Sequence, residues 1–261
     1  MKIAVLIKQV PASNDVTVNP QTHCLIRENA EMTVNPSDLN AITAALALKQ
    51  QVGGTVTVLT MGPPDANRAL RTALAMGSDE AWLLTDRCFG GGDTLGTAKV
   101  LKAALVHTGP YDLVLAGDAS SDGATGQVGP MVAELMGLPC ATDARKLDLE
   151  GDKLSVLRQW KSQKVRVRMS LPCMATVGLG SNQPILPTIR SQMKANKVEI
   201  PTLTNQDLSL DTAVIGMPGA KSLVTDTLAR EGSHRKAEML TGTPEEIAKR
   251  IKELMDEEGE R

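Results

Sequence analysis

Small and polar residues of the kind that bind anions gather in one loop, residues 117–128. The loop follows an apolar run at residues 111–116, which has the length of a buried strand, and precedes a helical pattern that includes Val132 and Leu135. A strand, a glycine-rich turn and a helix N-terminus make an anion site in α/β proteins, because unpaired backbone N–H groups and the positive helix end face the ligand. Hydroxyl, carboxylate and amide side chains in the loop add groups that can hold phosphates and a sugar. The loop therefore predicts a nucleotide- or flavin-binding protein.

No pattern of side chains points to acid–base catalysis. His23, His107 and His234 stand in separate contexts without a carboxylate or nucleophile pattern. The four cysteines are scattered and show no C-x-x-C spacing, which argues against a zinc or iron–sulfur site and against a disulfide framework. From these side chains we expect no catalytic residue and no metal.

The composition excludes several classes of function. The chain has 261 residues, 42% of them hydrophobic, with a formal net charge of −2 and no basic stripe of the kind that binds nucleic acid. Its apolar runs fall short of the ~20 residues of a membrane span, and the run at residues 3–7 is too short for a secretory signal. We expect a cytoplasmic protein that neither binds nucleic acid nor inserts into a membrane.

Strand-length apolar runs alternate with helical patterns in the first half of the chain. The runs lie at residues 3–7, 55–60, 80–84 and 113–116, and helical patterns follow at 38–51, 66–77 and 94–107. This alternation predicts an α/β fold, a three-layer and mostly parallel sheet with helices on both faces. The loops at residues 9–12, 61–64, 90–94 and 117–127 then lie on one side of the sheet, where such folds bind ligands.

The pattern changes after residue 146. Residues 147–149 and 154–159 predict a hairpin, with a third strand at 164–170. Residues 243–246 form a capping box, followed by a helix with Ile247, Ile251, Leu254 and Met255 on one face. We expect a nucleotide-binding domain at 1–200 and a C-terminal arm at 201–261 that packs on a partner; a loose tail is the alternative.

Five stretches of the chain together resemble one family, the electron-transfer flavoprotein beta subunits. They are residues 8–11, 34–36, 71–77 with a following acidic residue, 122–130, and Pro184 with 193–197. The resemblance covers residues 1 to about 200 in order and at matching spacing. It implies a heterodimer whose alpha subunit holds a redox FAD, while the beta subunit holds either AMP or a second FAD.

The resemblance also implies which residues contact the nucleotide. Position by position, they are Leu6, Asn35, Asp38, Met61, Gly117, Asp118, Asp122, Gly123, Ala124, Thr125, Gly126, Gln127 and Val128. Hydroxyls and backbone N–H groups suit phosphate oxygens, and glycine permits close approach.

A second glycine run, at residues 90–92, leads into Asp93, Thr94 and Thr97. Asp93 suits an N-cap, which is one interpretation of this stretch. The other is a ligand contact, because the electron-bifurcating relatives look similar here and Thr94 and Thr97 share a helix face that reaches a diphosphate or a flavin ring. We favour FAD over AMP in this subunit on that resemblance.

Two departures from the family bear on charge and on partners. Asp118 stands where relatives often carry Arg or Lys, and Ile185 and Leu186 replace an Arg–aromatic pair in the recognition loop. Ile189 stands at the family's apolar anchor for its partner. The resemblance implies an acyl-CoA dehydrogenase or reductase as that partner, contacted by Ile185, Leu186 and Ile189.

Two other functions are compatible with an α/β nucleotide-binding chain. One is an ATP-using adenylating or pyrophosphatase-like enzyme, because residues 90–94 resemble its phosphate loop. The other is a homodimeric nucleotide-sensing protein, which leaves the hairpin and the C-terminal arm without a role.

Overall fold

The computed structural model describes residues 1–12, 17–18, 25–26, 31–223 and 239–259, and His23, Cys24 and His234 lie outside this part. The chain divides into two compact units, Met1–Asp226 and Thr227–Arg261.

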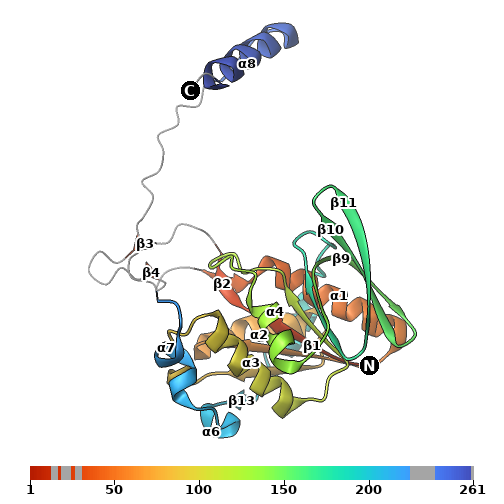
Figure 1. Cartoon of the computed structure of the whole chain (residues 1–261), viewed down its shortest axis with the longest axis vertical. Coiled ribbons are helices and arrows are strands. Elements are labelled where there is room, and N and C mark those ends of the chain that lie inside the picture. Colours follow the sequence, from red (N-terminus) through yellow and green to blue (C-terminus); the bar gives the residue numbers. More distant parts are fainter. Residues whose placement is uncertain (13–16, 19–24, 27–30, 224–238, 260–261) are drawn as a thin grey trace. The chain divides into compact units, whose positions relative to one another are not determined.

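One large sheet organises the first unit (Figure 1). In the described residues its strands lie in the order β11-β10-β9-β12-β8-β1-β6-β7-β13. The seven strands from β9 to β13 in this order run parallel, and β10 and β11 extend the sheet antiparallel. The bounds are β1 Lys2–Ile7, β6 Thr55–Met61, β7 Glu80–Leu84, β8 Leu113–Gly117, β9 Cys140–Glu150, β10 Lys153–Trp160, β11 Gln163–Ser170, β12 Cys173–Val177 and β13 Thr202–Leu203.

Two short pairs of strands stand apart from the large sheet. β2 (Gln9–Pro11) pairs with β5 (Met32–Val34), and β3 (Thr17–Val18) pairs with β4 (Leu25–Ile26), both antiparallel. The β2–β5 pair brings the chain from the end of β1 to the start of the first helix.

The central strands are mostly apolar because both faces of the sheet are covered, although β6 and β12 also bury threonines. In β1, Ile3, Val5 and Ile7 face one core, while Ala4 and Leu6 face the other. Alternate side chains of a strand point to opposite faces, so a strand between two helix layers is buried on both sides and favours apolar residues. A fully buried aliphatic side chain stabilises the fold by about 1.5–3 kcal/mol.

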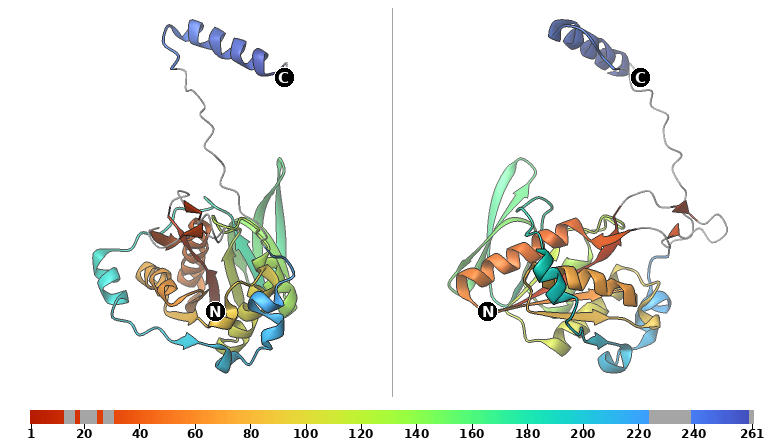
Figure 2. Two further views of the ribbon diagram at one scale, coloured as in Figure 1. Left: turned by 90° about the vertical axis from the view of Figure 1, so that its left-hand side faces the viewer. Right: turned by 180° about the vertical axis from the view of Figure 1, so that it is seen from behind.

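Helices cover both faces of the sheet (Figure 1, Figure 2). Ala41 and Ile42 of α1 (Pro36–Val52) and Leu70 of α2 (Asn67–Met76) join the first core. Leu101 of α3 (Thr94–Thr108) and Val132 of α4 (Val128–Met136) join the second. The predicted three-layer α/β fold is therefore confirmed. Shorter helical elements are η1 Pro64–Ala66, η2 Arg87–Phe89, α5 Ile189–Ala195, α6 Asn205–Leu208, η3 Thr212–Val214 and α7 Gly216–Gly219.

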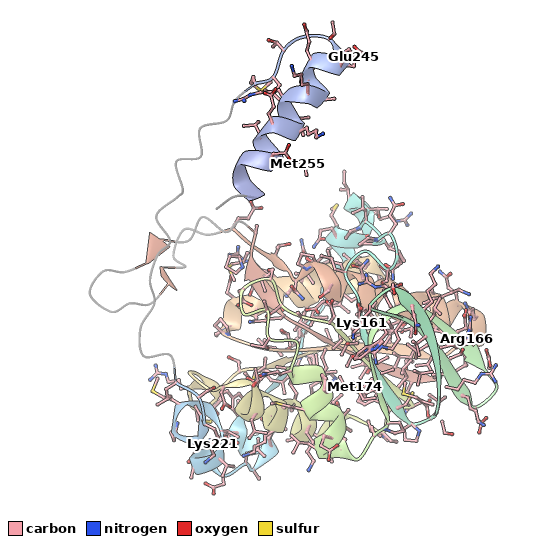
Figure 3. The ribbon with its side chains drawn as sticks, turned by 45° about the horizontal axis from the view of Figure 1, so that its top comes forward. Lys161, Arg166, Met174, Lys221, Glu245 and Met255 are labelled. Atoms are coloured by element: carbon pink, nitrogen blue, oxygen red, sulfur yellow. The ribbon has the colours of Figure 1, made fainter. Side chains whose placement is uncertain are left out.

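The predicted hairpin is part of the main sheet. Strand β9 pairs with β12 through its first residues and with β10 through its last, so that the hairpin continues the sheet beyond β12. Met174 of β12 is fully buried, whereas Lys161 stands in the turn between β10 and β11 (Figure 3).

Residues 201–223 belong to the α/β unit. We expected the arm to begin at residue 201, but Thr202–Leu203 adds strand β13 beside β7, and Leu203 and Ile215 are buried in the second core. Met217 N–H donates to the Gly90 carbonyl at 3.0 Å, which holds α7 on the glycine run.

The second unit carries helix α8 (Pro244–Gly259), the terminal helix that we predicted. Its capping box forms: Thr243 N–H donates to Glu246 Oε2 at 2.9 Å, and Glu246 N–H donates to Thr243 Oγ1 at 3.4 Å. Ile251 and Met255, on the apolar face of α8, are 45% and 70% exposed. Figure 3 labels Met255 on this helix. No helix in the described part of the chain is both long enough and apolar enough to cross a membrane.

Candidate functional site

The strand order reverses between β1 and β8. From β1 the chain moves to β6 and β7 on one side, and it then returns to β8 on the other side of β1. The segments that leave the carboxyl ends of these two strands diverge to opposite faces, which opens the crevice where open α/β sheets bind ligands. The predicted loop, which spans residues 118–127 between the end of β8 and the start of α4, lies at this point.

Asp38 joins the two strand ends. Its carboxylate accepts from the backbone N–H of Lys8 at 2.7 Å and from that of Gly117 at 3.0 Å. Burial raises the pKa of Asp38 to about 7, and the hydrogen bonds from Asn35, Lys8 and Gly117 oppose this rise. The side chain of Asp38 thus links the carboxyl ends of β1 and β8 at the base of the crevice.

Asn35 fixes the first half of the loop. Its side-chain amide donates to Asp38 Oδ1 at 3.1 Å and to the Ala119 carbonyl at 2.9 Å, and its Oδ1 accepts from Ser121 N–H at 3.0 Å. Ser37 Oγ also donates to the Ala119 carbonyl, at 2.8 Å. Asn35 is buried, and its hydrogen-bond partners are all groups of the protein. Its side chain therefore fixes the conformation of the first half of the loop.

Gly117 is required where the loop begins. A Cβ atom at this position would overlap the side chains of Ser37 and Asp38. The close approach of β8 to the start of α1 therefore depends on a residue without a side chain.

The second half of the loop presents free donors. Within the described residues, the backbone N–H groups of Thr125, Gly126 and Gln127 donate to no acceptor. These residues are exposed, and Gly126 has a φ of 62°. Helix α4 begins directly afterwards at Val128, so its first N–H groups and its positive end add to the same site. This arrangement fits the phosphate groups of a nucleotide.

The loop after β7 meets this site through Thr94. Thr94 Oγ1 donates to Gln127 Oε1 at 2.9 Å, which brings together two of the predicted stretches. Thr97 follows one turn later on α3 and is half-buried. Thr94 and Gln127 therefore border the crevice from two different loops.

Asp93 accepts hydrogen bonds from the protein backbone instead of facing the crevice with a free carboxylate. Its Oδ1 accepts from Gly96 N–H at 2.9 Å and so caps α3, while its Oδ2 accepts from Lys221 N–H at 2.7 Å and from Ser222 N–H at 3.3 Å. Hydrogen bonds from Gly96 and Lys221 hold the pKa of Asp93 below its usual range. The carboxylate is therefore engaged with backbone on both sides, as the N-cap interpretation expects.

The remaining nucleotide candidates occupy different depths. Leu6 is 5% exposed and belongs to the second core, whereas Met61 is half-buried at the end of β6. The carboxylate of Asp118 accepts from the adjacent Ala119 N–H at 2.8 Å, so it is occupied by a local hydrogen bond. Gly123 and Ala124 form the turn of the loop, where Ala124 N–H donates to the Ser120 carbonyl at 2.8 Å and Ala124 has a φ of 49°.

Lys8 is a residue that our site prediction omitted. Its Nζ lies 2.6 Å from Asp122 Oδ1 and 2.7 Å from Oδ2, so it bridges the end of β1 and the loop after β8. Burial alone would raise the pKa of Asp122, but hydrogen bonds from Lys8, Ser120 and Gly123 outweigh it and lower that pKa. The signal in the sequence was a lysine directly after the first strand, at a position that parallel topology brings to the ligand edge.

The predicted partner contacts lie on the segment after β12. Leu186 and Ile189 are 82% and 84% exposed, and Ile185 is 39% exposed. Helices α1 and α2 hold this segment at both ends, since Asn40 Nδ2 donates to the Asn182 carbonyl at 2.7 Å and Arg71 donates to the Ala195 carbonyl at 2.7 Å.

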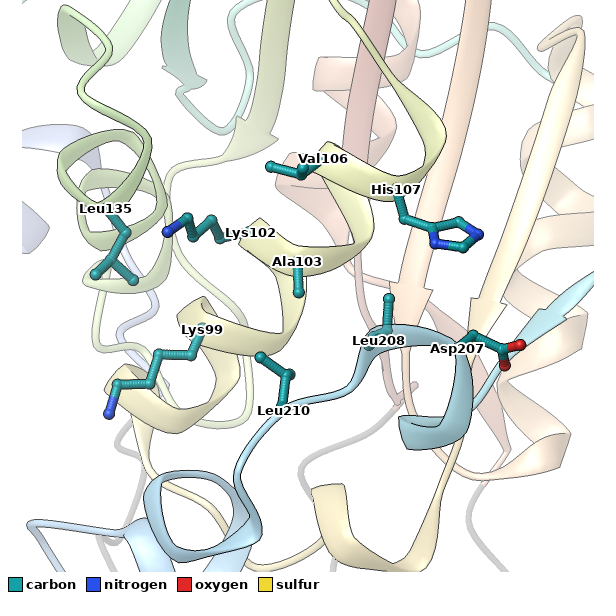
Figure 4. Close-up of a pocket in the computed structure, with 9 residues that line it drawn as sticks. All are labelled: Lys99, Lys102, Ala103, Val106, His107, Leu135, Asp207, Leu208 and Leu210. Carbon is teal, nitrogen blue, oxygen red and sulfur yellow. The ribbon is translucent and has the colours of Figure 1, made fainter.

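A groove on the outer side of α3 contains none of the predicted residues (Figure 4). Its lining comes from α3, α4 and the α6 region: Lys99, Lys102, Ala103, Val106, His107, Leu135, Asp207, Leu208 and Leu210. In the described part of the chain, no cluster of three or more His, Cys, Asp or Glu side chains could hold a metal ion.

Comparison with known proteins identifies the family of the chain. A family model described as the electron transfer flavoprotein domain matches residues 22–208. The chain is 42% identical over 257 residues to the electron transfer flavoprotein subunit beta of Thermoanaerobacterium thermosaccharolyticum, covering 98% of both chains. It is 38% identical over 244 residues to the caffeyl-CoA reductase-Etf complex subunit CarD of Acetobacterium woodii, covering 93% of both. It is also 38% identical over 248 residues to protein FixA of Azorhizobium caulinodans, covering 92% of this chain and 88% of that protein. With these matches over nearly its whole length, the chain belongs to the beta subunits of the electron-transfer flavoprotein family.

Proposed function

We propose that this beta subunit binds FAD in the crevice between β1 and β8 and, with an alpha subunit that holds a second FAD, passes electrons between carriers. The observation that carries the proposal is the row of unbonded N–H groups at residues 125–127 in front of α4, with Thr94 bonded to Gln127 beside it. These donors suit the phosphates of a dinucleotide. The chemistry that a bound flavin supplies is the exchange of two electrons with NADH and of single electrons with other carriers.

The residues of the chain have binding tasks in this function. The N–H groups at residues 125–128 hold phosphate oxygens, and Asp122 with the hydroxyl of Thr125 faces the ribose. Thr94 and Thr97 extend the site along α3, beyond what a mononucleotide needs, and this favours FAD over AMP. The specific form of the proposal is an electron-bifurcating complex, in which NADH supplies both electrons.

The exposed apolar side chains after β12 provide a docking surface for the electron-exchange partner. Leu186, Ile189 and Met193 are 82%, 84% and 60% exposed, and Ile189 and Met193 lie one turn apart on α5. We assign this surface to an acyl-CoA dehydrogenase or reductase. The similarity to CarD, a subunit of a caffeyl-CoA reductase-Etf complex, supports a reductase as the partner.

The docking surface makes a prediction about Ile189. Replacing it by aspartate should lower the rate of electron exchange with the partner at least about tenfold, because a charge would be desolvated in the interface. The nucleotide content should not change. Val106→Asp is the matched control, since Val106 is 66% exposed on α3. Equal rates for the two variants, measured by stopped-flow absorbance, would remove the docking role.

The nucleotide content of the purified heterodimer tests the proposal directly. Acid release and chromatography should give two FAD and no AMP per heterodimer. One FAD and one AMP would contradict the second-flavin form and leave a simple electron shuttle with a structural AMP. A heterodimer without nucleotide on this subunit would overturn the proposed site.

A further inference from the structure

Lys8 is the first residue after strand β1, and its main chain is bonded on both sides. Its N–H donates to Asp38 Oδ2 at 2.7 Å, and its carbonyl accepts from Asn35 N–H at 2.9 Å. The side chain therefore starts from a rigid point at the edge of the crevice. A long side chain that starts from a rigid point loses less freedom on binding a ligand.

The ammonium group of Lys8 is held on the loop that presents the free N–H groups. Its two hydrogen bonds within the described residues both go to Asp122, at 2.6 and 2.7 Å. Asp122 is itself fixed by Gly123 N–H at 2.7 Å, and its side chain is only 13% exposed. An ammonium carries three donors, so one remains for a ligand. The Lys8 side chain is 47% exposed, which leaves it open to such a ligand.

The negative charge of the loop explains why a phosphate would need a cation at this position. The loop carries the carboxylates of Asp118 and Asp122, and both would repel a phosphate group. The Lys8 ammonium neutralises one of them in the structure. A phosphate that binds at residues 125–128 thus needs this cation, since uncharged N–H groups alone would leave it beside a net negative loop.

We propose that Lys8 binds the phosphate oxygens of the ligand, and that Asp122 positions its ammonium for this contact. This inference rests on the proposed nucleotide site. It makes Lys8 the residue by which the site prefers a phosphorylated ligand to a nucleoside. A merely structural ion pair at this exposure would contribute little and would not distinguish the two ligands.

Titration of the nucleotide-stripped heterodimer with FAD, AMP and adenosine tests the assignment. Lys8→Gln should weaken FAD and AMP binding about tenfold or more and leave adenosine binding within about twofold, because a charge-assisted hydrogen bond to phosphate is lost. The salt dependence of AMP binding should also become shallower. Lys2→Gln is the matched control, an exposed lysine at the opposite end of the same strand.

A second variant separates the roles of the two partners. Asp122→Asn removes the carboxylate that positions the ammonium, so it should reduce the preference for AMP over adenosine, but less than Lys8→Gln does, since the Lys8 ammonium remains. If Lys8→Gln leaves the ratio of AMP to adenosine affinity unchanged, Lys8 is only a structural partner of Asp122 and the inference is overturned. If the unaltered heterodimer binds neither FAD nor AMP at this subunit, the proposed nucleotide site itself fails, which is a distinct result.

Discussion

At the scale of single residues, the crevice depends on groups buried beneath it. Asn35, Ser37 and Asp38 come from the start of α1 and bond to the ends of β1 and β8 and to the loop. Their side chains make the hydrogen bonds that backbone groups at strand ends otherwise lack. The loop that we propose to bind a ligand is therefore positioned by these three side chains.

Gly117→Ala should destabilise the protein by about 1–3 kcal/mol, because the new methyl group would overlap Ser37 and Asp38 in a packed region. The measurement is urea-induced unfolding of the heterodimer. Gly123→Ala is the control within the same loop, since its Cβ would find Ser120 Oγ at 3.5 Å, an ordinary contact. A loss no larger than that of the control would show that α1 and β8 can separate at little cost.

Asp38 makes a prediction about pH. Its folded pKa of about 7 lies above the ordinary value of 3.8, so the folded protein keeps this proton where the unfolded chain releases it. The stability contributed by Asp38 is fully present below pH 3.8 and is lost as the pH rises to about 7. Asp38→Asn lacks this titration, so the free energy of unfolding of the unaltered protein should fall relative to that of the variant between these pH values. A difference that stays flat, or that rises with pH, contradicts the assignment.

At the scale of elements, helix α3 connects the crevice with the chain that leaves the first unit. Thr94 at its first position bonds Gln127, and Asp93 before it bonds the backbone at residues 221–222. Gly92 lies against Gly216, where a Cβ atom would approach the Gly216 Cα to 3.1 Å. The glycine run therefore serves close packing against residues 214–222.

Asp93→Ala should destabilise the protein by about 1–2 kcal/mol through loss of the N-cap. It should also speed tryptic cleavage after Lys221, because the backbone at Lys221 and Ser222 loses its acceptor. Asp211→Ala is the control, as Asp211 caps only the short η3 through Ala213 N–H at 2.9 Å. If both variants are cleaved after Lys221 at the same rate, Asp93 does not hold this segment.

At the scale of the whole molecule, the position of a truncation should decide whether the protein folds. A chain that ends at Asp226 keeps Leu203 and Ile215 in the second core, so its first unit should unfold at a temperature close to that of the full chain. A chain that ends at residue 201 loses both side chains, each contributing about 1.5–3 kcal/mol, and should unfold far below it. Differential scanning calorimetry checks this, and equal melting temperatures would contradict it.

The same truncation tests the role that we assign to helix α8. Ile251 and Met255 are exposed within their unit, so we expect α8 to bury them against the alpha subunit. Removal of residues 227–261 should then weaken heterodimer assembly while leaving the first unit folded. Undiminished assembly in gel filtration would leave α8 without this role.

The sequence by itself determined the α/β class and the family and predicted the ligand edge, because these depend on local patterns. Apolar runs such as residues 3–7 and 113–116 specify buried strands, and parallel topology puts the following loops on one side. The capping box before α8 is likewise a short-range signal, and it forms as predicted.

Only the tertiary structure decided which polar residues bond one another around the crevice. Asp38 lies 79 positions from Gly117, Lys8 lies 114 from Asp122, and Asp93 lies 128 from Lys221, so no spacing along the chain could reveal these bonds. A carboxylate in a loop has the same appearance in sequence whether it bonds a ligand, a lysine or a buried N–H group, and packing between distant segments selects among them.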